Sequence, residues 1–318
     1  MLQLHALNQT ILDDPRFRLA MTPPAPRPSA PEEHVDSAVN RLRAERTRLG
    51  QEVGGLSKVG VVVDSALRTD AVEHMDEDGY PEKGKLAIAL GLHMMNVVSA
   101  SYLRFFELIA PMLRQIEERH GRPARVLELA SGSGGFAIAL ASLAAKRGLR
   151  VEVTGSDIVP LYVERGQRKA AAEGAAVTFR HLDALNMHDL EDGAYDIVFI
   201  AQSTHHFSPG QLGRMIAESR RVATTAFVSV DGYRSLGMVA FVSGTALLTL
   251  WPAMVHDATI SARKFYPEAE LEAIARMAAP GAPVRLGRIW PLNTTLTVRF
   301  DRELVSMGET PKPPPQAS

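Results

Sequence analysis

From residue 125 onward the chain alternates between two kinds of segment, and this alternation restricts its possible folds more than any other feature. Short runs rich in β-branched residues, typical of buried strands, are separated by Ala- and Leu-rich stretches of helical length. Strands that alternate with helices build βαβ units, so a parallel sheet covered by helices on both faces is predicted. The strand-like runs are RVLEL, VEVTG, AVTFR, YDIVFI and TAFVSV, and the helical stretches include residues 135–146, 161–173 and 210–221.

Two further strand-like runs, residues 284–290 and 292–300, follow this pattern and meet at Pro291. Such a tight connection cannot join parallel neighbours, so the two runs are expected to pair as an antiparallel hairpin. The predicted fold class is therefore α/β, with a Rossmann-like doubly wound sheet over residues 120–303. The sheet is expected to be mostly parallel, with the antiparallel hairpin at its C-terminal end.

Residues 1–119 are predicted to form a helical N-terminal extension or lid. Apolar residues three or four positions apart between Leu103 and Ile116 indicate a helix that faces a core. Residues 22–31 are rich in proline, which excludes a regular helix or central strand and predicts a linker. Residues 304–318 are predicted to be a disordered tail.

The charge balance and the absence of cysteine exclude several classes of function. Lys and Arg number 35 against 36 Asp and Glu, so the basic excess typical of nucleic-acid-binding proteins is absent. A chain without cysteine has no disulfide, thiolate nucleophile or cysteine-bound zinc. No metal site is predicted.

The sequence also bears on location and assembly. No segment has the pattern of a signal peptide, so a cytoplasmic location is expected. The most apolar run, residues 239–255, is short for a membrane span and contains Ser, Gly, Thr and Pro. It is predicted to be a buried helix, and no integral membrane association is expected. The oligomeric state is left open, with a homodimer among the alternatives.

A glycine-rich turn follows the first predicted strand, in the segment VLELASGSGG (residues 126–135). Glycines between a strand and a helix let the backbone approach a ligand closely and present amide N–H groups at the helix start. Gly132, Gly134 and Ala137 also fit the dinucleotide pattern G-x-G-x-x-G/A. A glycine-rich turn without a ligand is the alternative.

Three acidic residues stand at the ends of the first three predicted strands. Glu128 precedes the glycine turn, where a carboxylate suits the cationic amino-acid portion of a cofactor. Asp157 ends the second strand and can accept both hydroxyls of a ribose, and Asp183 follows the third, where it can accept from an adenine amino group. Each could instead cap a helix or lie on the surface. All three at the rim where open α/β sheets bind ligands indicate a cofactor site.

The series VLELASGSG, Asp157, Asp183-Ala184 and YDIVFIAQSTHHF resembles the motifs of class I S-adenosylmethionine-dependent methyltransferases in order and spacing. The later segments DGYRS and HDATISARKFYPEAEL are similar to a branch near the ubiquinone and menaquinone C-methyltransferases and their relatives in natural-product pathways. Ala130 departs from the pattern, because it stands where the family usually has its first glycine. Alanine is tolerable there if its φ stays negative.

The resemblance implies S-adenosylmethionine as cofactor and assigns each part of it to residues of this chain. The methionine portion would be bound by Glu128, Ala130, Gly132 and Gly134. The ribose and adenine would contact Asp157 and Ile158, and the adenine edge would contact Asp183 and Ala184. Gln202 would face the methyl-donor region.

Three residues are candidates for catalysis. His205 and His206 follow the fourth strand, where either could be a base or a hydrogen-bond partner of the substrate. The alternative is a structural histidine at the helix start near Ser208. Arg234 follows the fifth strand and could clamp an acidic or carbonyl-bearing substrate, or simply pair with Asp231.

The sequence thus predicts transfer of a methyl group from S-adenosylmethionine to a small acceptor, on oxygen, nitrogen or carbon. An aromatic or apolar acceptor is expected, in secondary metabolism or quinone-type biosynthesis. The enzymatic alternative is an NAD(P)-dependent oxidoreductase, and the non-enzymatic one is a methyltransferase-like domain that binds without catalysis.

Overall fold

The computed structural model describes residues 2–15, 17, 32–247, 251–289 and 293–301. The predicted linker at residues 22–31, the predicted tail at residues 304–318 and the hairpin junction at Pro291 lie outside this part of the chain.

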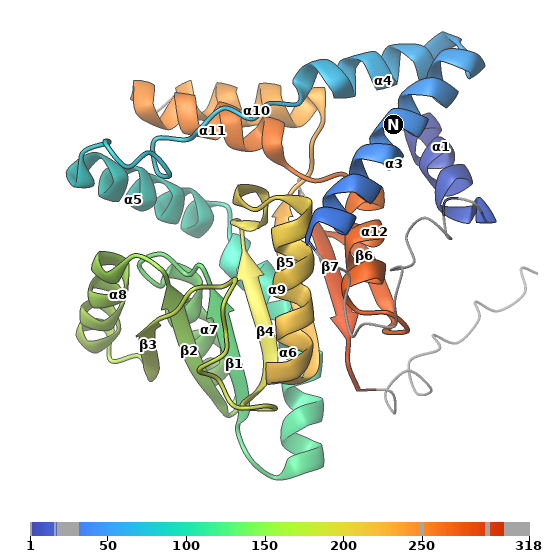
Figure 1. Cartoon of the computed structure of the whole chain (residues 1–318). Helices are drawn as coiled ribbons and strands as arrows, with labels where there is room; N and C mark the ends of the chain where they lie inside the picture. The colour runs from blue at the N-terminus through green and yellow to red at the C-terminus, as the bar shows by residue number, and fades with distance from the viewer. Residues whose placement is uncertain (1, 16, 18–31, 248–250, 290–292, 302–318) are drawn as a thin grey trace, which may run out of the picture.

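A seven-stranded sheet forms the centre of the molecule, in the order β3-β2-β1-β4-β5-β7-β6 (Figure 1). The first five strands are parallel, and β7 pairs antiparallel with both β5 and β6. The predicted fold class, including the antiparallel hairpin, is confirmed. The strands are β1 (Ala124–Leu129), β2 (Val151–Asp157), β3 (Val177–His181), β4 (Tyr195–Ala201), β5 (Ala223–Gly232), β6 (Val284–Ile289) and β7 (Asn293–Arg299).

The strand order reverses between β1 and β4, because the chain moves outward to β2 and β3 and then returns to the other side of β1. In open α/β sheets this switch point leaves a crevice at the carboxyl ends of the strands, and ligands bind there. The glycine turn leaves β1 at this crevice, and the two histidines leave β4 beside it.

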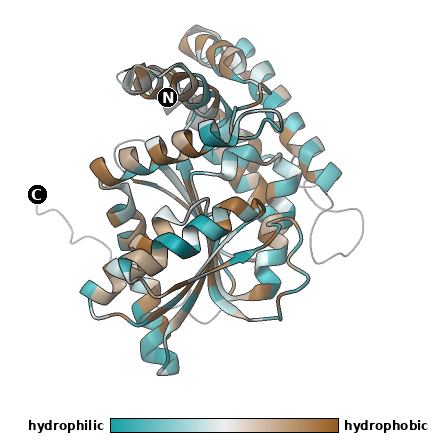
Figure 2. Cartoon of the chain, turned by 90° about the vertical axis from the view of Figure 1, so that its left-hand side faces the viewer, coloured by the Kyte–Doolittle hydropathy of each residue, from teal (hydrophilic) through white to brown (hydrophobic). Residues whose placement is uncertain are grey.

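Helices cover both faces of the sheet and bury two separate hydrophobic cores. One core includes Phe105, Phe136 and Phe199, and the other includes Leu127, Phe227 and Leu212. Burial of each such side chain contributes about 1.5–3 kcal/mol. In Figure 2, brown and teal alternate along the outer helices, as expected of helices that bury only one face. The first face carries α6 (Ser101–His120), α7 (Gly135–Lys146) and α8 (Pro160–Glu173), and the second α3 (Glu32–Val53), α9 (Pro209–Val222) and α12 (Glu268–Ala278).

Further helices lie over the carboxyl ends of the strands (Figure 1). The packing of α11 on α10 and α5 buries a small apolar cluster that includes Ile88 and Met254. We call this layer, together with the loop of residues 68–81, the lid. Its helices are α5 (Glu82–Val98), α10 (Leu236–Leu247) and α11 (Pro252–Lys264), and α1 (Leu2–Asp13) and α4 (Gly55–Leu67) pack on α3 beside it.

The prediction of one buried helix over residues 239–255 is wrong. Its described residues divide between α10, which ends at Leu247, and α11, which begins at Pro252. Phe241 and Leu247 are 51% and 59% exposed, whereas Met254 is buried in the apolar cluster of the lid. Within the described residues, no single helix is long and apolar enough to span a membrane, and only α5 and α6, bent by 68° at their junction, reach that length and hydropathy together.

Candidate functional site

The glycine turn between β1 and α7 has a left-handed backbone at three positions: Ala130, Gly132 and Gly134, with φ of 47°, 54° and 80°. A side chain at Gly134 would also collide with the ring of Phe179, because a Cβ there would lie 2.2 Å from the ring. Glycine is therefore required at position 134 for both conformation and space. The condition under which alanine is readily tolerated here, a negative φ, is not met, and the chain holds Ala130 in a conformation that costs an L-residue about 1–2 kcal/mol.

Replacing Ala130 by glycine is expected to stabilise the protein by about 0.5–1 kcal/mol. The relief of left-handed strain outweighs the added freedom of the unfolded chain, which costs about 0.4–1 kcal/mol. Urea denaturation measures this change. Ala139→Gly, in the interior of α7, is the matched control and is expected to destabilise by about 1 kcal/mol. A loss of stability in Ala130→Gly would show that the turn carries no strain at this position.

Asp157 connects the end of β2 to the glycine turn. One carboxylate oxygen accepts a hydrogen bond from the N–H of Gly132 at 2.8 Å, and the other accepts from the N–H of Val159 at 2.9 Å. Burial raises the pKa of this carboxyl group, while the backbone donors oppose the shift. Each carboxylate oxygen has a second lone pair, so the group can still accept from the two hydroxyls of a ribose.

Glu128 lies beneath the same turn and is 3% exposed. Its Oε2 atom is buried without a hydrogen-bond partner, and burial raises its pKa to about 8, to which the negative charge of Asp157 adds. A buried carboxyl group in this state gains most from a cation. The site is thus suited to a positively charged ligand group above the turn.

The remaining predicted cofactor residues lie along the same rim. Asp183 follows β3 and accepts the N–H of Leu185 at 2.8 Å, and Ala184 beside it is buried. Ile158 is 57% exposed, so its side chain is open to a flat ligand. Glu128 is the penultimate residue of β1, Asp157 is the last residue of β2, and Asp183 lies two residues beyond β3. The three strands are neighbours in the sheet, so these residues lie along one rim, as the sequence predicts.

Gln202 leaves β4 with a left-handed backbone, at φ 53°, and contacts the lid. Its Oε1 atom accepts a hydrogen bond of 2.5 Å from Asn96 on α5. Tyr102, at the start of α6, joins His93 of α5 through a 3.0 Å hydrogen bond. The end of α5 therefore lies directly over the switch point of the sheet.

His205 and Asp231 form a buried pair at the ends of β4 and β5. The Asp231 carboxylate accepts the His205 backbone N–H at 3.0 Å and bonds its Nδ1 at 2.8 Å. A carboxylate at Nδ1 selects the tautomer with the proton on that nitrogen, which leaves Nε2 as the free acceptor. This Nε2 atom is buried without a hydrogen bond and lies 3.7 Å from Oε1 of Glu73, in the lid.

His206 lies beside His205, with their ring centroids 4.3 Å apart. Its Nδ1 atom bonds Asp76 of the lid loop at 2.7 Å. Burial alone lowers the pKa of His206, but Asp76 and the neighbouring carboxylates outweigh it and raise the pKa above its ordinary value. The alternative role as a helix cap belongs to Ser208 instead, which forms a complete capping box with Gln211 at the start of α9.

Arg234 does not pair with Asp231. Its Nε atom donates to Asp64 of α4 at 3.0 Å, and its Nη1 atom donates to the carbonyl of Phe265 at 2.9 Å. It is 6% exposed and also lies 3.6 Å from Glu270. These contacts attach the segment after β5 to α4 and α12, and the side chain belongs to a buried ion network.

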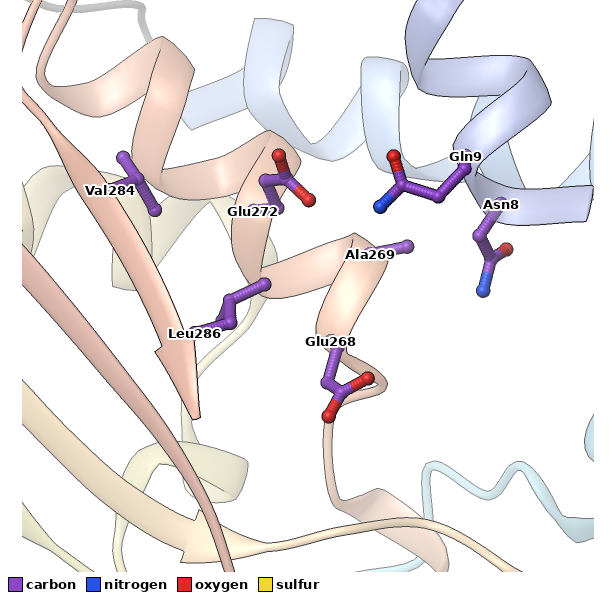
Figure 3. Close-up of a pocket in the computed structure, with 7 residues that line it drawn as sticks. All are labelled: Asn8, Gln9, Glu268, Ala269, Glu272, Val284 and Leu286. Carbon is purple, nitrogen blue, oxygen red and sulfur yellow. The ribbon is translucent and has the colours of Figure 1, made fainter. Parts of the chain in front are cut away.

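Two cavities lie at different places in the molecule. One of about 490 Å³ lies between α5, α8 and the glycine turn, lined by residues that include His93, Ser133 and Lys169. Another of about 300 Å³ lies between α1, α12 and β6, and Figure 3 shows the side chains that line it. The first borders the predicted cofactor site, whereas the second contacts none of the predicted site residues.

Comparisons with known proteins identify the domain that carries this rim. Residues 126–225 match the family described as a methyltransferase domain. Over 102 residues the chain is 36% identical to the demethylmenaquinone methyltransferase of Deinococcus radiodurans, a stretch that covers 32% of this chain and 39% of that protein. The chain contains a class I S-adenosylmethionine-dependent methyltransferase domain. The resemblance seen in the sequence is confirmed, with S-adenosylmethionine as cofactor, and the oxidoreductase alternative is not supported.

The fold is shared with a solved methyltransferase. The plantazolicin methyltransferase BamL, solved with a triazolic desmethylPZN analogue and SAH, has a TM-score of 0.53 and 13% identity, over 84% of this chain and 100% of that one. Magnesium protoporphyrin IX methyltransferase from Synechocystis PCC 6803, solved with bound SAH, has a TM-score of 0.45 and 19% identity, over 71% and 91%. At such identities the likeness to BamL shows the fold of the domain and nothing about its acceptor.

The residues of the methyltransferase domain fit the cofactor. The buried, unpartnered Oε2 atom of Glu128 suits the ammonium group of the amino-acid portion of the cofactor. Sequence reasoning missed the residues that the lid contributes, among them Glu73, Asn96 and Lys264. Glu73 lies in a loop without periodicity, and Asn96 lies on a helix whose pattern indicates only its apolar face, so neither carries a signal of its own.

Proposed function

We propose that the protein transfers a methyl group from S-adenosylmethionine to a small acceptor bound between the lid and the ends of β4 and β5. The observation that carries this proposal is the position of Asp157. Its buried carboxylate binds the glycine turn inside the segment that matches the methyltransferase family. The ribose of the cofactor would occupy its remaining lone pairs, and the reactive sulfonium would then lie toward Gln202.

When bound, the cofactor supplies an electrophilic methyl group whose carbon–sulfur bond breaks with the electron pair left on sulfur. The protein aligns the acceptor with that bond and excludes water. His205, oriented by Asp231, presents Nε2 toward the acceptor side, and His206 lies next to it. We propose that these two side chains contact the acceptor, where either could accept its proton or form a hydrogen bond with it.

For Arg234 the contacts favour a positioning role. Its guanidinium group donates hydrogen bonds to Asp64 and to the carbonyl of Phe265. The ring of Phe265 in turn packs edge-on against His205. Arg234 would therefore act by holding Phe265 and the lid in place rather than by contacting the acceptor.

An aromatic or apolar acceptor is the proposed substrate class. The lid side of the site is built from apolar helices whose cluster includes Met95, Val242 and Trp251. The partial relative from Deinococcus radiodurans is named a demethylmenaquinone methyltransferase, and a quinone-type acceptor would belong to this class. We propose a role in natural-product or quinone-type biosynthesis in the cytoplasm, with methylation on oxygen, nitrogen or carbon.

Asp157→Ala is expected to weaken the binding of S-adenosylmethionine at least roughly tenfold, equivalent to about 1.4 kcal/mol. The substitution removes the ribose contact and loosens the glycine turn together. Titration calorimetry measures the affinity, and transfer of a labelled methyl group across a set of phenols, quinols and amines measures turnover. Asp189→Ala, an exposed aspartate in the loop after β3, is the control and should leave both unchanged. Unaltered cofactor affinity in Asp157→Ala would refute the assigned site.

A further inference from the structure

A cluster of potential metal ligands lies where the lid loop meets the end of β4. Glu73, His205 and His206 each offer one ring nitrogen or carboxylate oxygen, and these three atoms lie within 4.8 Å of one another. Two of the residues come from consecutive positions after β4, and the third comes from a loop more than 130 positions earlier. We propose that these three side chains bind a divalent transition-metal ion such as zinc.

The hydrogen bonds of the two histidines prepare them for this role. Asp231 bonds Nδ1 of His205 at 2.8 Å, and Asp76 bonds Nδ1 of His206 at 2.7 Å. In metal sites a ligating histidine commonly donates one ring N–H to a carboxylate, which leaves the other nitrogen free for the metal. Both histidines have this arrangement, and each Nε2 is the nitrogen that remains.

Two buried polar atoms in the cluster have no hydrogen bond, which points independently to a missing ligand. They are Nε2 of His205, whose residue is 8% exposed, and Oε1 of Glu73, whose residue is 2% exposed and which has only a longer ionic contact with Lys264. Leaving a buried polar group without a hydrogen bond costs about 1–3 kcal/mol. The two atoms lie 3.7 Å apart. Ligands about 2.1 Å from a tetrahedral zinc lie about 3.4 Å from each other, so a small adjustment suffices.

The charge around the cluster also suits a divalent cation. Three carboxylates, those of Glu73, Asp76 and Asp231, surround the imidazoles, and Lys264 contacts two of them, Glu73 and Asp76. Its Nζ atom lies 3.5 Å from Oε1 of Glu73 and 4.0 Å from Asp76. With neutral imidazoles these side chains hold two negative charges in excess, which one divalent ion balances. Ser261 donates to the other oxygen of Glu73 at 2.6 Å and holds the carboxylate in place.

Two histidines and one carboxylate form a three-ligand set that leaves further positions of the metal open, as in catalytic metal sites. Here the proposal deepens the proposed function, because an open position would lie where the acceptor enters. A hydroxyl oxygen of the acceptor bound there would lose its proton to solvent more readily. Its lone pair would then form the bond to the methyl carbon as the carbon–sulfur bond breaks. The acceptor class would be a phenol or an enol.

A second group, His74, His256 and Asp257, provides a comparison within the same lid. Asp257 is already occupied, because its carboxylate accepts the N–H groups of His74 and Met75 and bonds Nδ1 of His256. The rings of His74 and His256 are stacked, with centroids 4.1 Å apart. This group therefore serves as the control.

The test measures metal content and metal binding without recourse to turnover. Wild-type protein purified without chelator is expected to contain one equivalent of metal by mass spectrometry. After chelator treatment, titration with Co²⁺ is expected to give one binding event and the visible absorption bands of cobalt bound to nitrogen and oxygen. Glu73→Gln and His206→Gln should weaken this binding by more than the roughly 10–100-fold typical of outer-shell changes. His256→Gln should leave it unchanged.

Lys264→Met gives a second, independent readout, because removal of the competing ammonium group should tighten Co²⁺ binding. Circular dichroism of each variant checks that it is folded. Absence of stoichiometric metal and of cobalt bands in the wild-type protein would overturn the proposal, as would equal affinity in Glu73→Gln and wild type. Failure of the metal site would leave cofactor binding intact, whereas failure of the proposed function would appear as unaltered S-adenosylmethionine affinity in Asp157→Ala.

Discussion

Glu270→Gln is expected to lower the free energy of unfolding by about 3–5 kcal/mol, the typical cost of breaking a buried ion pair by removing one partner. The Glu270 side chain is completely buried in α12 and accepts hydrogen bonds from Arg43, Arg46 and Arg68 at 2.8–3.3 Å. Asp64 is the other carboxylate of this network, to which Arg234 also belongs. Removal of the Glu270 charge leaves Arg46, Arg68 and Arg234 to share the Asp64 carboxylate. Arg43 loses its ion-pair partner in this network. Urea denaturation at neutral pH measures the loss.

The pH dependence of this difference has a definite sign. Burial alone raises the pKa of Glu270, but Arg68, Arg43 and Arg234 hold it well below the ordinary value of 4.5. A depressed pKa in the folded state means that the stabilisation is fully present above about pH 4.5 and is lost as the pH falls through the folded-state pKa. The difference in the free energy of unfolding between wild type and Glu270→Gln should therefore become smaller at acid pH.

Glu272→Gln is the matched control for Glu270. Glu272 is on the same helix, with a partly buried side chain, and pairs with the exposed Arg276 one turn later. Such pairs contribute about 0.3–0.5 kcal/mol, so this variant should unfold almost as wild type does. Equal losses in the free energy of unfolding of the two variants would mean that the buried ion network does not stabilise the packing of α3 and α4 on α12.

His205→Ala is expected to lower kcat by about 10²–10⁴-fold while the affinity for S-adenosylmethionine stays within error. The side chain lies at the ends of β4 and β5, whereas the carboxylates for the cofactor lie at the ends of β1, β2 and β3. The effect is expected whether Nε2 meets the acceptor directly or through a bound cation. Steady-state turnover and calorimetry on the same preparation separate the two quantities.

Asp231→Asn sharpens this test, because it preserves the shape of the pair but favours the wrong tautomer of His205. It should lower kcat and leave cofactor affinity unchanged, which a merely structural histidine would not do. His188→Ala, with a side chain 69% exposed, is the surface control and should turn over as wild type does. Unaltered turnover in His205→Ala would remove this residue from the mechanism.

Much of the fold and of the cofactor rim could be predicted from local sequence. Alternating periodicities specify βαβ units, and the handedness and closeness of such units bring successive strand ends to one rim. Glu128, Asp157 and Asp183 each lie at or near the end of a strand. Their position on one rim could therefore be predicted without knowledge of contacts between distant segments.

The backbone conformation of the glycine turn could not be predicted from local sequence. The sequence showed that Ala130 replaces a glycine, but the sign of its φ is decided by how the turn fits between β1, β4 and the carboxylate of Asp157. Residues 239–255 were likewise predicted to be buried because they are apolar, whereas burial depends on what packs against them. Hydropathy alone cannot distinguish a core helix from a lid helix.

The amino-acid sequence by itself determined the strand–helix order, the rim and the class of cofactor, because these depend on short-range periodicity and on residues adjacent to strand ends. Only the tertiary structure decided the partners of His205, His206 and Arg234. Those partners are Asp231 and Glu73 for His205, Asp76 for His206, and Asp64 for Arg234. They come from separate segments of the chain that only tertiary packing brings together, and such packing leaves no periodic signal in the sequence.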